Sequence, residues 1–489
     1  MFKKLQNKPK VEKMKPVVKL SVSKAAANVH EELEAKTSVV VPTAVAVVDG
    51  KPKKTADVQT LRGMKDVLPD DQLYWEMIRN KAEELAAAYG FKWIETPILE
   101  RTELFTRPLG KESDVVQKEM YSFLDQGGDK VTLRPEGTAS VARAYVNHGM
   151  WTWPQPVKIF YWGPMFRYDR PQKGRYRQFH QAGFEVLGSQ LPIVDAELIL
   201  IVYNLYKELG LETKVMLNSI GTPESRQDYL AQLVPYYRSN RQKLCEDCKR
   251  RLQKNPLRVL DCKEPSCVEV KNAAPQMIDW LDEDSKAHFM KVLEYLDEVE
   301  VPYTLNSHLV RGFDYYTRTV FEFWVEGAED VAQVALCGGG RYDGLVEMLG
   351  GQPTPACGVA PGIERLVLAL KEKGIPPKQV KKPQIFLAQL GEQARVKALS
   401  LFEEFRKANI QVLQTFAKEA LKSQLELANK HGVPYTLILG QKEVLDGTIL
   451  IRDMDGGNQE NVDMKKVVGE IKKKLKALDE LPAAENGEK

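Results

Sequence analysis

The stretch numbered 160–188, FYWGPMFRYDRPQKGRYRQFHQAGFEVLG, constrains the fold of this chain more than any other segment. Two runs with the alternation of β-strands, Ile159–Phe166 and Gln178–Leu187, flank a turn that contains a proline and a glycine. Between them, residues 167–177 include five basic residues and one acidic residue. We therefore predict a β-hairpin whose tip is strongly cationic.

The composition of this hairpin favours a binding site for a polyanion. The planar fork of an arginine donates two parallel hydrogen bonds to a phosphate and keeps its charge in a partly dry site. A charge-rich tip that is merely solvated is the simpler interpretation. The aromatic residues argue against it, because they offer flat surfaces on which a base can stack. They are Phe160, Tyr161, Trp162, Phe166, Tyr168, Tyr176 and Phe179.

Length and composition limit the class of protein. A chain of 489 residues is too long for one core, so we expect two to four domains. A net charge of +3 is too small to indicate nucleic-acid binding by itself, so any contact with RNA must be local. The longest apolar run, 38–48, is broken by Pro42 and is too short to span a membrane. Six cysteines in so long a chain do not suggest a disulfide framework, and a reducing cytoplasm is expected.

Polar residues recur beside turns and strand entrances elsewhere in the chain. The run TLRPEGT places Glu136 and Thr138 beside a glycine. The run LVRGFDYYTRTVFEFW places Arg311 and a tyrosine pair, Tyr315 and Tyr316, before a predicted strand at 317–324. The run ALCGGGRYD is predicted to be a strand ending in three glycines, where backbone can approach a ligand closely.

The predicted strand that follows the hairpin tip carries two further polar residues. Gln181, Gly183 and Glu185 share one strand face, because strand side chains alternate with a period of two. We therefore expect the side chains of Gln181 and Glu185 to point into one pocket.

The segment 357–370 is predicted to form a strand, a turn and a helix. Its apolar residues, 363, 366, 367 and 370, follow the spacing of a buried helix face, and Arg365 lies off that face. Arg365 also falls in the first helical turn, where the helix dipole disfavours a cation. An anionic ligand would resolve this conflict.

The C-terminal part of the chain has a separate pattern. Three strands, Ile385–Leu390, Ile410–Thr415 and Tyr435–Leu439, alternate with helical segments and predict a small α/β unit with a largely parallel sheet.

Together these segments resemble the motifs of class II aminoacyl-tRNA synthetases, and the match is closest to histidyl-tRNA synthetases of the bacterial type. The resemblance extends from about residue 61 to about residue 475. It implies an α+β catalytic domain, built on an antiparallel sheet flanked by helices, with a helical insertion and a C-terminal α/β anticodon-binding domain. A predicted helix at 72–89 and a strand at 91–96 resemble motif 1, which implies a homodimer.

Domain boundaries are expected where the composition and the pattern change. The expected units are a disordered basic extension at 1–57, a first catalytic part at 58–221, a helical insertion at 222–305, a second catalytic part at 306–378, an anticodon-binding domain at 383–478 and a tail at 479–489.

The resemblance also implies roles for individual residues. Arg311 and Arg167 would be catalytic, Arg167 and Arg365 would bind ATP, and Gln172 and Arg175 would meet the acceptor end of the tRNA. The histidine-binding residues would be Glu136, Thr138, Gln181, Glu185, Arg311, Tyr315 and Tyr316.

The implied function is that of a histidine–tRNA ligase. Such an enzyme activates L-histidine with ATP and Mg²⁺ and transfers it to the 3′ end of histidine tRNA. One alternative is the non-catalytic, histidine-sensing regulatory subunit of ATP phosphoribosyltransferase, whose members usually lack the C-terminal domain. Another is a prolyl or threonyl synthetase, which lacks the LVRGFDYYTRT run.

Four cysteines within the predicted insertion have a spacing that suits a metal. They form the series C-x2-C-x13-C-x4-C, made of Cys245, Cys248, Cys262 and Cys267. Four thiolates can hold a tetrahedral Zn²⁺ ion. The alternative is four reduced thiols beside a local core, and the family resemblance does not imply a metal here.

Overall fold

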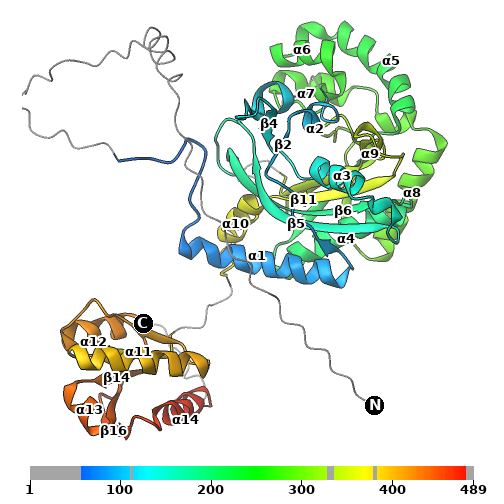
Figure 1. Cartoon of the computed structure of the whole chain (residues 1–489). Helices are drawn as coiled ribbons and strands as arrows, with labels where there is room; N and C mark the ends of the chain where they lie inside the picture. Colours follow the sequence, from blue (N-terminus) through cyan, green and yellow to red (C-terminus); the bar gives the residue numbers. More distant parts are fainter. Residues whose placement is uncertain (1–56, 111–112, 114, 328–334, 378–382, 481–489) are drawn as a thin grey trace, which may run out of the picture. The chain divides into compact units, whose positions relative to one another are not determined.

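The computed structural model describes residues 57–110, 113, 115–327, 335–377 and 383–480 (Figure 1). The expected extension at 1–57 and the tail at 479–489 fall almost wholly outside the described residues. Two bodies are described separately below: a main body, residues 57–377, and a C-terminal domain, residues 383–480. Within the described ranges, no helix combines the length and the apolar character that crossing a bilayer requires.

The described part of the main body is built on an eight-stranded sheet with the order β1-β5-β6-β11-β10-β9-β7-β8. Its inner strands pair antiparallel, and a short parallel strand closes each edge. The predicted antiparallel sheet and the predicted hairpin are both confirmed. The strands are β1 (Lys92–Trp93), β5 (Val157–Phe166), β6 (Gln178–Leu187), β7 (Thr213–Ser219), β8 (Tyr303–Leu305), β9 (Thr317–Val325), β10 (Cys337–Arg341) and β11 (Ala356–Pro361).

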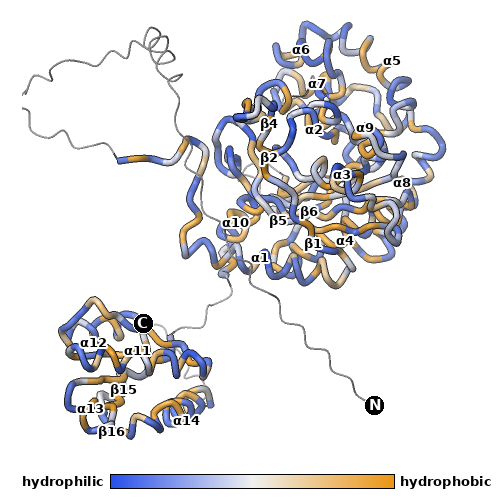
Figure 2. Tube along the Cα trace, viewed as in Figure 1, coloured by the Kyte–Doolittle hydropathy of each residue, from blue (hydrophilic) through white to orange (hydrophobic). Residues whose placement is uncertain are grey.

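One face of this sheet is covered by helices that share a core with it. These are α1 (Pro69–Ala88), α4 (Pro192–Glu208), α8 (Glu283–Glu298) and α10 (Ile363–Glu372). Both α1 and α4 begin with a proline at the first helical turn, which explains why α1 starts three residues before the predicted position 72. Figure 2 shows the resulting concentration of hydrophobic residues along the strands and α4.

The opposite face carries a second core, formed with α2 (Glu103–Thr106), α3 (Thr138–Asn147), α9 (Leu345–Met348) and an insertion of helices. The alternation along β5 separates the two cores, since Phe160 belongs to the first and Ile159 and Tyr161 to the second. Beside this face, described residues form a small three-stranded sheet of β2 (Leu99–Arg101), β4 (Lys130–Leu133) and β3 (Tyr121–Leu124). Two short helical elements lie elsewhere on the chain, the π-helix η1 (Val115–Glu119) before β3 and the 3-10 helix η2 (Met150–Thr152) after α3.

The insertion ends earlier in the chain than the expected range 222–305. Helix α8 packs in the first core and β8 pairs with β7 of the main sheet, so both belong to the main body. The insertion proper consists of α5 (Pro223–Ser239), α6 (Glu246–Lys254) and α7 (Pro265–Asn272). The short 3-10 helices η3 (Arg241–Lys243) and η4 (Pro256–Val259) join them, and η5 (Met277–Trp280) leads from α7 to α8.

The glycines of the run ALCGGGRYD also lie differently from the prediction. Strand β10 does not end at them but runs through all three to Arg341. A side chain at Gly339 would collide with the ring of Phe321 and the carbonyl oxygen of Gly358 on the neighbouring strands. These glycines therefore allow close strand packing.

The C-terminal domain contains a five-stranded sheet among its described residues, with the order β13-β12-β14-β15-β16. The three predicted strands are confirmed and pair parallel, whereas β15 and β16, which were not predicted, add two antiparallel pairings. The strands are β12 (Ile385–Gln389), β13 (Val412–Gln414), β14 (Tyr435–Leu439), β15 (Thr448–Asp453) and β16 (Gln459–Asp463). The helices are α11 (Glu392–Lys407), α12 (Leu421–Lys430), α13 (Gln441–Asp446) and α14 (Val467–Asp479).

A buried ion pair ties the middle of the main sheet to its helices. The Arg341 guanidinium, at the end of β10, donates to Asp195 of α4 over 2.6 Å, and both side chains are fully buried. His288 of α8 lies 2.7 Å from the other oxygen of Asp195. The pair therefore links one central strand to two helices.

We predict that Arg341→Met destabilises the main body strongly. The variant leaves the Asp195 carboxylate buried without its guanidinium, and breaking such a pair costs about 3–5 kcal/mol. Urea unfolding followed by tryptophan fluorescence measures the change in unfolding free energy. As a control, Arg79→Met removes an exposed ion pair with Glu83 and should cost less than about 1 kcal/mol. Equal small losses in both variants would show that the pair is not a structural anchor.

Candidate active site

A cavity of about 600 Å³ lies on the face of the main sheet that α1 and α4 leave uncovered. Most of the residues predicted from the sequence line it, although they come from distant parts of the chain. They are Glu136, Thr138, Arg167, Arg175, Gln181, Arg311, Tyr315, Tyr316 and Arg365. Gln172 and Glu185 do not line it.

One end of the cavity holds a carboxylate at the start of a helix. Glu136 accepts hydrogen bonds from the backbone amides of Thr138, over 2.7 Å, and Ala139, over 2.8 Å, at the first turn of α3. The side chain is buried, and burial raises the pKa of its carboxyl despite these two donors. The amides therefore hold the carboxylate in one orientation beside the cavity.

Glu185 lies behind this end of the cavity. Its carboxylate accepts hydrogen bonds from the hydroxyls of Thr138, over 2.7 Å, and Tyr342, over 2.5 Å. Complete burial raises the pKa of the Glu185 carboxyl to about 8. The expectation that Gln181 and Glu185 both point into the pocket is therefore wrong for Glu185, which supports Thr138 instead.

Gln181 does line the cavity, and its Oε1 atom is buried without a hydrogen-bond partner among the described residues. Gly183, two residues further on, faces the ring of Tyr161 on the paired strand, and any side chain there would overlap that ring. The same strand face thus offers one unpaired acceptor, a glycine and a buried carboxyl.

Arg311 contributes a guanidinium to the cavity. It forms an ion pair with Glu322 of β9 and lies 5.6 Å from the centroid of the Tyr316 ring. A side chain at Gly338 would overlap the guanidinium, so this glycine makes room for it. The Nε atom of Arg311 is buried and has no hydrogen-bond partner within the described ranges. Such an atom can serve a ligand.

Three more arginines gather near the hairpin. The Arg167 guanidinium lies 5.3 Å from the ring centroids of both Phe179 and Phe313. Arg365 donates to the backbone carbonyl of Gly174 over 3.0 Å. Burial, followed by the charges of Arg175 and Arg167, lowers the pKa of Arg365 to about 10. Arginines that lie close together in a partly buried site repel one another, and a bound anion would reduce this repulsion. The sequence pattern around Arg365 predicts such an anion.

The hairpin aromatics only partly flank these cations. Phe160 lies in the first core rather than beside the arginines. Tyr168 stacks on Arg177 at 3.6 Å, and Phe179 faces Arg167. At the tip, Gln172 pairs through its backbone with Arg175; Arg175 lines the cavity, and Gln172 does not.

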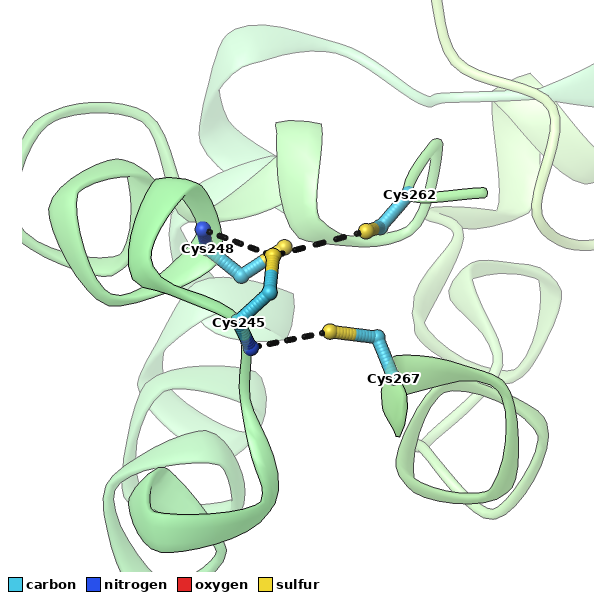
Figure 3. A group of neighbouring side chains, drawn as sticks. All are labelled: Cys245, Cys248, Cys262 and Cys267. Carbon is cyan, nitrogen blue, oxygen red and sulfur yellow. Dashed lines mark hydrogen bonds between the residues drawn. The ribbon is translucent and has the colours of Figure 1, made fainter. Parts of the chain in front are cut away.

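The four cysteines converge in the insertion, as Figure 3 shows. Cys245 and Cys248 come from the start of α6, Cys267 comes from the start of α7, and Cys262 lies between η4 and α7. All four sulfur atoms lie within 4.8 Å of one another, and those of Cys245 and Cys262 are 3.9 Å apart.

Several residues of the site were not predicted from the sequence. Glu322 pairs with Arg311, Tyr342 and Tyr161 donate to Glu185, and Phe313 faces Arg167. A signal existed for Glu322, which stands between two phenylalanines in a strand and is therefore a polar residue in an apolar run. Tyr161 belongs to the hairpin aromatics and Tyr342 to the run ALCGGGRYD, but neither pattern indicates a hydrogen bond to Glu185.

We predict that Glu185→Gln removes a pH dependence of stability. Since burial raises the pKa of this carboxyl from 4.5 to about 8, the folded chain binds one more proton than the unfolded chain between these values. The stability contributed by the neutral carboxyl is full below about pH 4.5 and is lost as the pH rises to about 8. Thermal unfolding between about pH 5 and about pH 8 should show a smaller decrease in Glu185→Gln than in wild type.

The control for this measurement is Glu83→Gln, which changes a surface carboxyl on α1 and should keep the wild-type slope. A wild-type slope in Glu185→Gln as well would show that this carboxyl is ionised in the folded protein.

Comparison with known proteins places the whole arrangement in one family. The model of the histidyl-tRNA synthetase family matches residues 63–366, and that of the anticodon-binding domain matches residues 384–474. A histidine–tRNA ligase of Dehalococcoides mccartyi is 47% identical over 418 residues, which cover 85% of this chain and 100% of the relative. A histidine–tRNA ligase of Pelotomaculum thermopropionicum is 45% identical over 415 residues, covering 85% and 97%.

A solved structure agrees with these relatives. The apo histidyl-tRNA synthetase of S. aureus is 38% identical and superposes with a TM-score of 0.71, covering 85% of this chain and 100% of that one. By sequence and by fold, the chain belongs to the histidyl-tRNA synthetase family.

Proposed function

We propose that this chain is a histidine–tRNA ligase, which forms histidyl-adenylate from L-histidine and ATP and then charges histidine tRNA. One observation carries the proposal: a single cavity joins a carboxylate end, at Glu136, to a group of partly buried arginines, at Arg167 and Arg365. An amino acid offers an ammonium group to the first, and a nucleotide offers phosphates to the second.

Histidine would occupy the carboxylate end. Glu136 and Thr138 are the partners for its polar groups, Gln181 offers an unpaired oxygen, and Tyr315 and Tyr316 line the cavity beside the imidazole. Glu185 would hold Thr138 in place from behind. A pocket of directed hydrogen bonds rejects analogues that cannot form them by ~10⁴ or more.

Adenylation would occur between the two ends. A carboxylate oxygen of histidine attacks the α-phosphorus of ATP, the bond from that phosphorus to the bridging oxygen breaks, and pyrophosphate leaves. Arg311 and Arg167 would neutralise the charge that develops on the phosphate oxygens, and Arg365 would hold the nucleotide. Because neighbouring groups already orient these side chains, little reorganisation is needed.

Transfer to tRNA completes the reaction. A hydroxyl of the terminal ribose attacks the histidyl carbonyl carbon, gives up its proton, and AMP leaves with the electron pair of the broken bond. The hairpin tip, with Gln172 and Arg175, is proposed to meet the acceptor end. The C-terminal domain, which matches the anticodon-binding family, would read the other end of the tRNA.

Mg²⁺ is proposed to bind together with ATP. In the described part of the chain, the cysteine group is the only cluster of three or more His, Cys, Asp or Glu ligands. Two carboxylates of the cavity, Glu136 and Glu322, are already engaged by helix amides and by Arg311. The ion would be held mainly by phosphate oxygens, whose charge it reduces.

The regulatory-subunit alternative is less well supported. Arg167, Arg311 and Arg365 are all present and reach one cavity, and the chain keeps a complete C-terminal domain. Pyrophosphate exchange with each amino acid in turn separates a histidine ligase from a sensor and from a prolyl or threonyl enzyme.

We also propose a homodimer that acts in the cytoplasm. Strand β1 is an edge strand, and Trp93, Ile98 and Leu99 in or near it are about half exposed. Phe123 and Leu124 of the small sheet are exposed as well. Large apolar side chains gathered on successive strands are typical of a surface that a second copy covers.

A structural Zn²⁺ ion at the four cysteines is a further proposal. Tetrahedral coordination with Zn–S bonds of about 2.3 Å places the sulfur atoms about 3.8 Å apart, close to the 3.9 Å between Cys245 and Cys262. Burial raises the pKa values of the Cys248 and Cys262 thiols. A cation that binds the thiolate form would offset this cost.

We predict that Arg311→Ala lowers kcat and kcat/KM for histidine-dependent pyrophosphate exchange by a factor on the order of 10² to 10³, with little change in KM for histidine. The variant also leaves Glu322 unpaired, so Arg311→Ala/Glu322→Gln tests the lost cation without the orphaned carboxylate. The exposed Arg107→Ala serves as a control. A variant that melts and exchanges pyrophosphate like wild type would remove Arg311 from the site.

We predict about one zinc ion per purified chain, measured by plasma mass spectrometry. Cys248→Ser should lose the ion. Cys357→Ser, which changes a buried cysteine of β11 outside the cluster, should keep it. Purified wild-type protein that contains no metal and is as stable as zinc-loaded protein would end the zinc proposal and leave the ligase proposal untouched.

A further inference from the structure

The segment that carries the cysteines also forms part of the active-site cavity. Cys245 and Cys262 line the same cavity as Arg311, and so does Lys263, the neighbour of Cys262. The other two cysteines are buried in the second core. The proposed metal site is therefore adjacent to the chemistry rather than remote from it.

Side chains of this segment contact the loop that carries Arg311. Asn255 Nδ2 donates to Asp314 Oδ1 over 3.0 Å. Arg258 Nη1 lies 3.1 Å from the point where a Cβ atom of Gly312 would stand, so the two segments are in close contact. Because Gly312 and Asp314 lie within the functional stretch 311–316, a shift of the inserted segment would displace that stretch.

The inserted segment also approaches the part of β9 that carries Glu322, the carboxylate paired with Arg311. Lys263 Nζ lies 5.6 Å from the ring centroid of Trp324, two residues beyond Glu322 on β9. Burial raises the pKa of Glu322 and Arg311 lowers it, and the charges of Asp261 and Lys263 act on the same carboxyl. The inserted segment thus contributes to the electrostatic environment of the Arg311–Glu322 pair.

Little regular structure holds this segment in place. Between α6 and α7 the chain forms only the short turn η4, and Cys262 follows it. Local bonds join the Cys262 amide to Val259 and its carbonyl to Lys271. A metal bound by Cys245, Cys248, Cys262 and Cys267 would tie this connection to the starts of both helices.

We propose that Zn²⁺ at the four cysteines holds one wall of the nucleotide pocket, so that zinc and ATP bind with positive coupling. This inference rests on the proposed adenylation and on the proposed metal site. Coupling between two binding sites is reciprocal: the factor by which zinc raises the affinity for nucleotide equals the factor by which nucleotide raises the affinity for zinc.

The first experiment measures zinc affinity in the full-length holoprotein by equilibrium competition with a chelator of known affinity. The probes are L-histidine together with an ATP analogue that carries a methylene group between its α- and β-phosphorus atoms. Together they should raise the zinc affinity ~5-fold or more, within the usual range of such couplings. Leucine with the same analogue controls for an amino acid that the pocket rejects and should have a smaller effect.

The second experiment uses a variant that keeps the metal ligands, because zinc-free protein can fail to fold. Lys263→Met changes the cavity wall without removing a thiolate, so it should keep its zinc but bind the analogue more weakly in calorimetry. Lys243→Met is the matched control, since Lys243 is an exposed residue of the same insertion and does not line the cavity. It should behave like wild type.

The outcomes separate the three proposals. Zinc affinity that is unchanged by histidine and the analogue, in protein that holds zinc and exchanges pyrophosphate, overturns the coupling alone. Protein without zinc ends both the metal site and the coupling but leaves the ligase. Failure of histidine-dependent pyrophosphate exchange, in protein that holds zinc, ends the proposed function instead.

Discussion

The register of β5 against β6 determines where the active site can form. The two strands pair over ten residues, with Tyr161 opposite Gly183 and Ile159 opposite Glu185. A shift of one residue would turn Gln181 and Glu185 toward α1 and α4 and bury the apolar side chains on the wrong face. Apolar packing on the first face of the sheet therefore keeps the polar groups on its second face. The positions of the cavity, the hairpin tip and helix α3 all follow from this pairing.

Burial of charged groups around the cavity costs free energy, and a bound substrate of opposite charge would reduce that cost. Glu136 is a buried carboxyl whose pKa burial raises, and Arg365 is a partly buried guanidinium whose pKa burial and two neighbouring cations lower. Each group would be more stable beside a partner of opposite charge. The amino acid and the nucleotide proposed as substrates would supply such partners at the two ends, so that binding energy would be directed toward the position where they react.

The sequence predicted the features that depend on local pattern. The hairpin follows from strand alternation, and the buried face of α10 follows from helical spacing, including Arg365 outside that face. Features that depend on distant pairing were missed. Helix α8 and strand β8 join the main body only because β8 pairs with β7 across the whole insertion. Likewise, buried Glu185 accepts a hydrogen bond from Tyr342, although no local pattern connects the two residues.

The strand order has a consequence for the synthesis of this protein. Strands β9, β10 and β11 lie between β6 and β7, although all three follow both of them in the chain. While the ribosome is still adding the insertion, the edges of β6 and β7 have no neighbours from the later strands. Open strand edges of this kind invite pairing with other chains. The nascent protein therefore passes through a stage in which its largest sheet is incomplete and two of its strand edges are open.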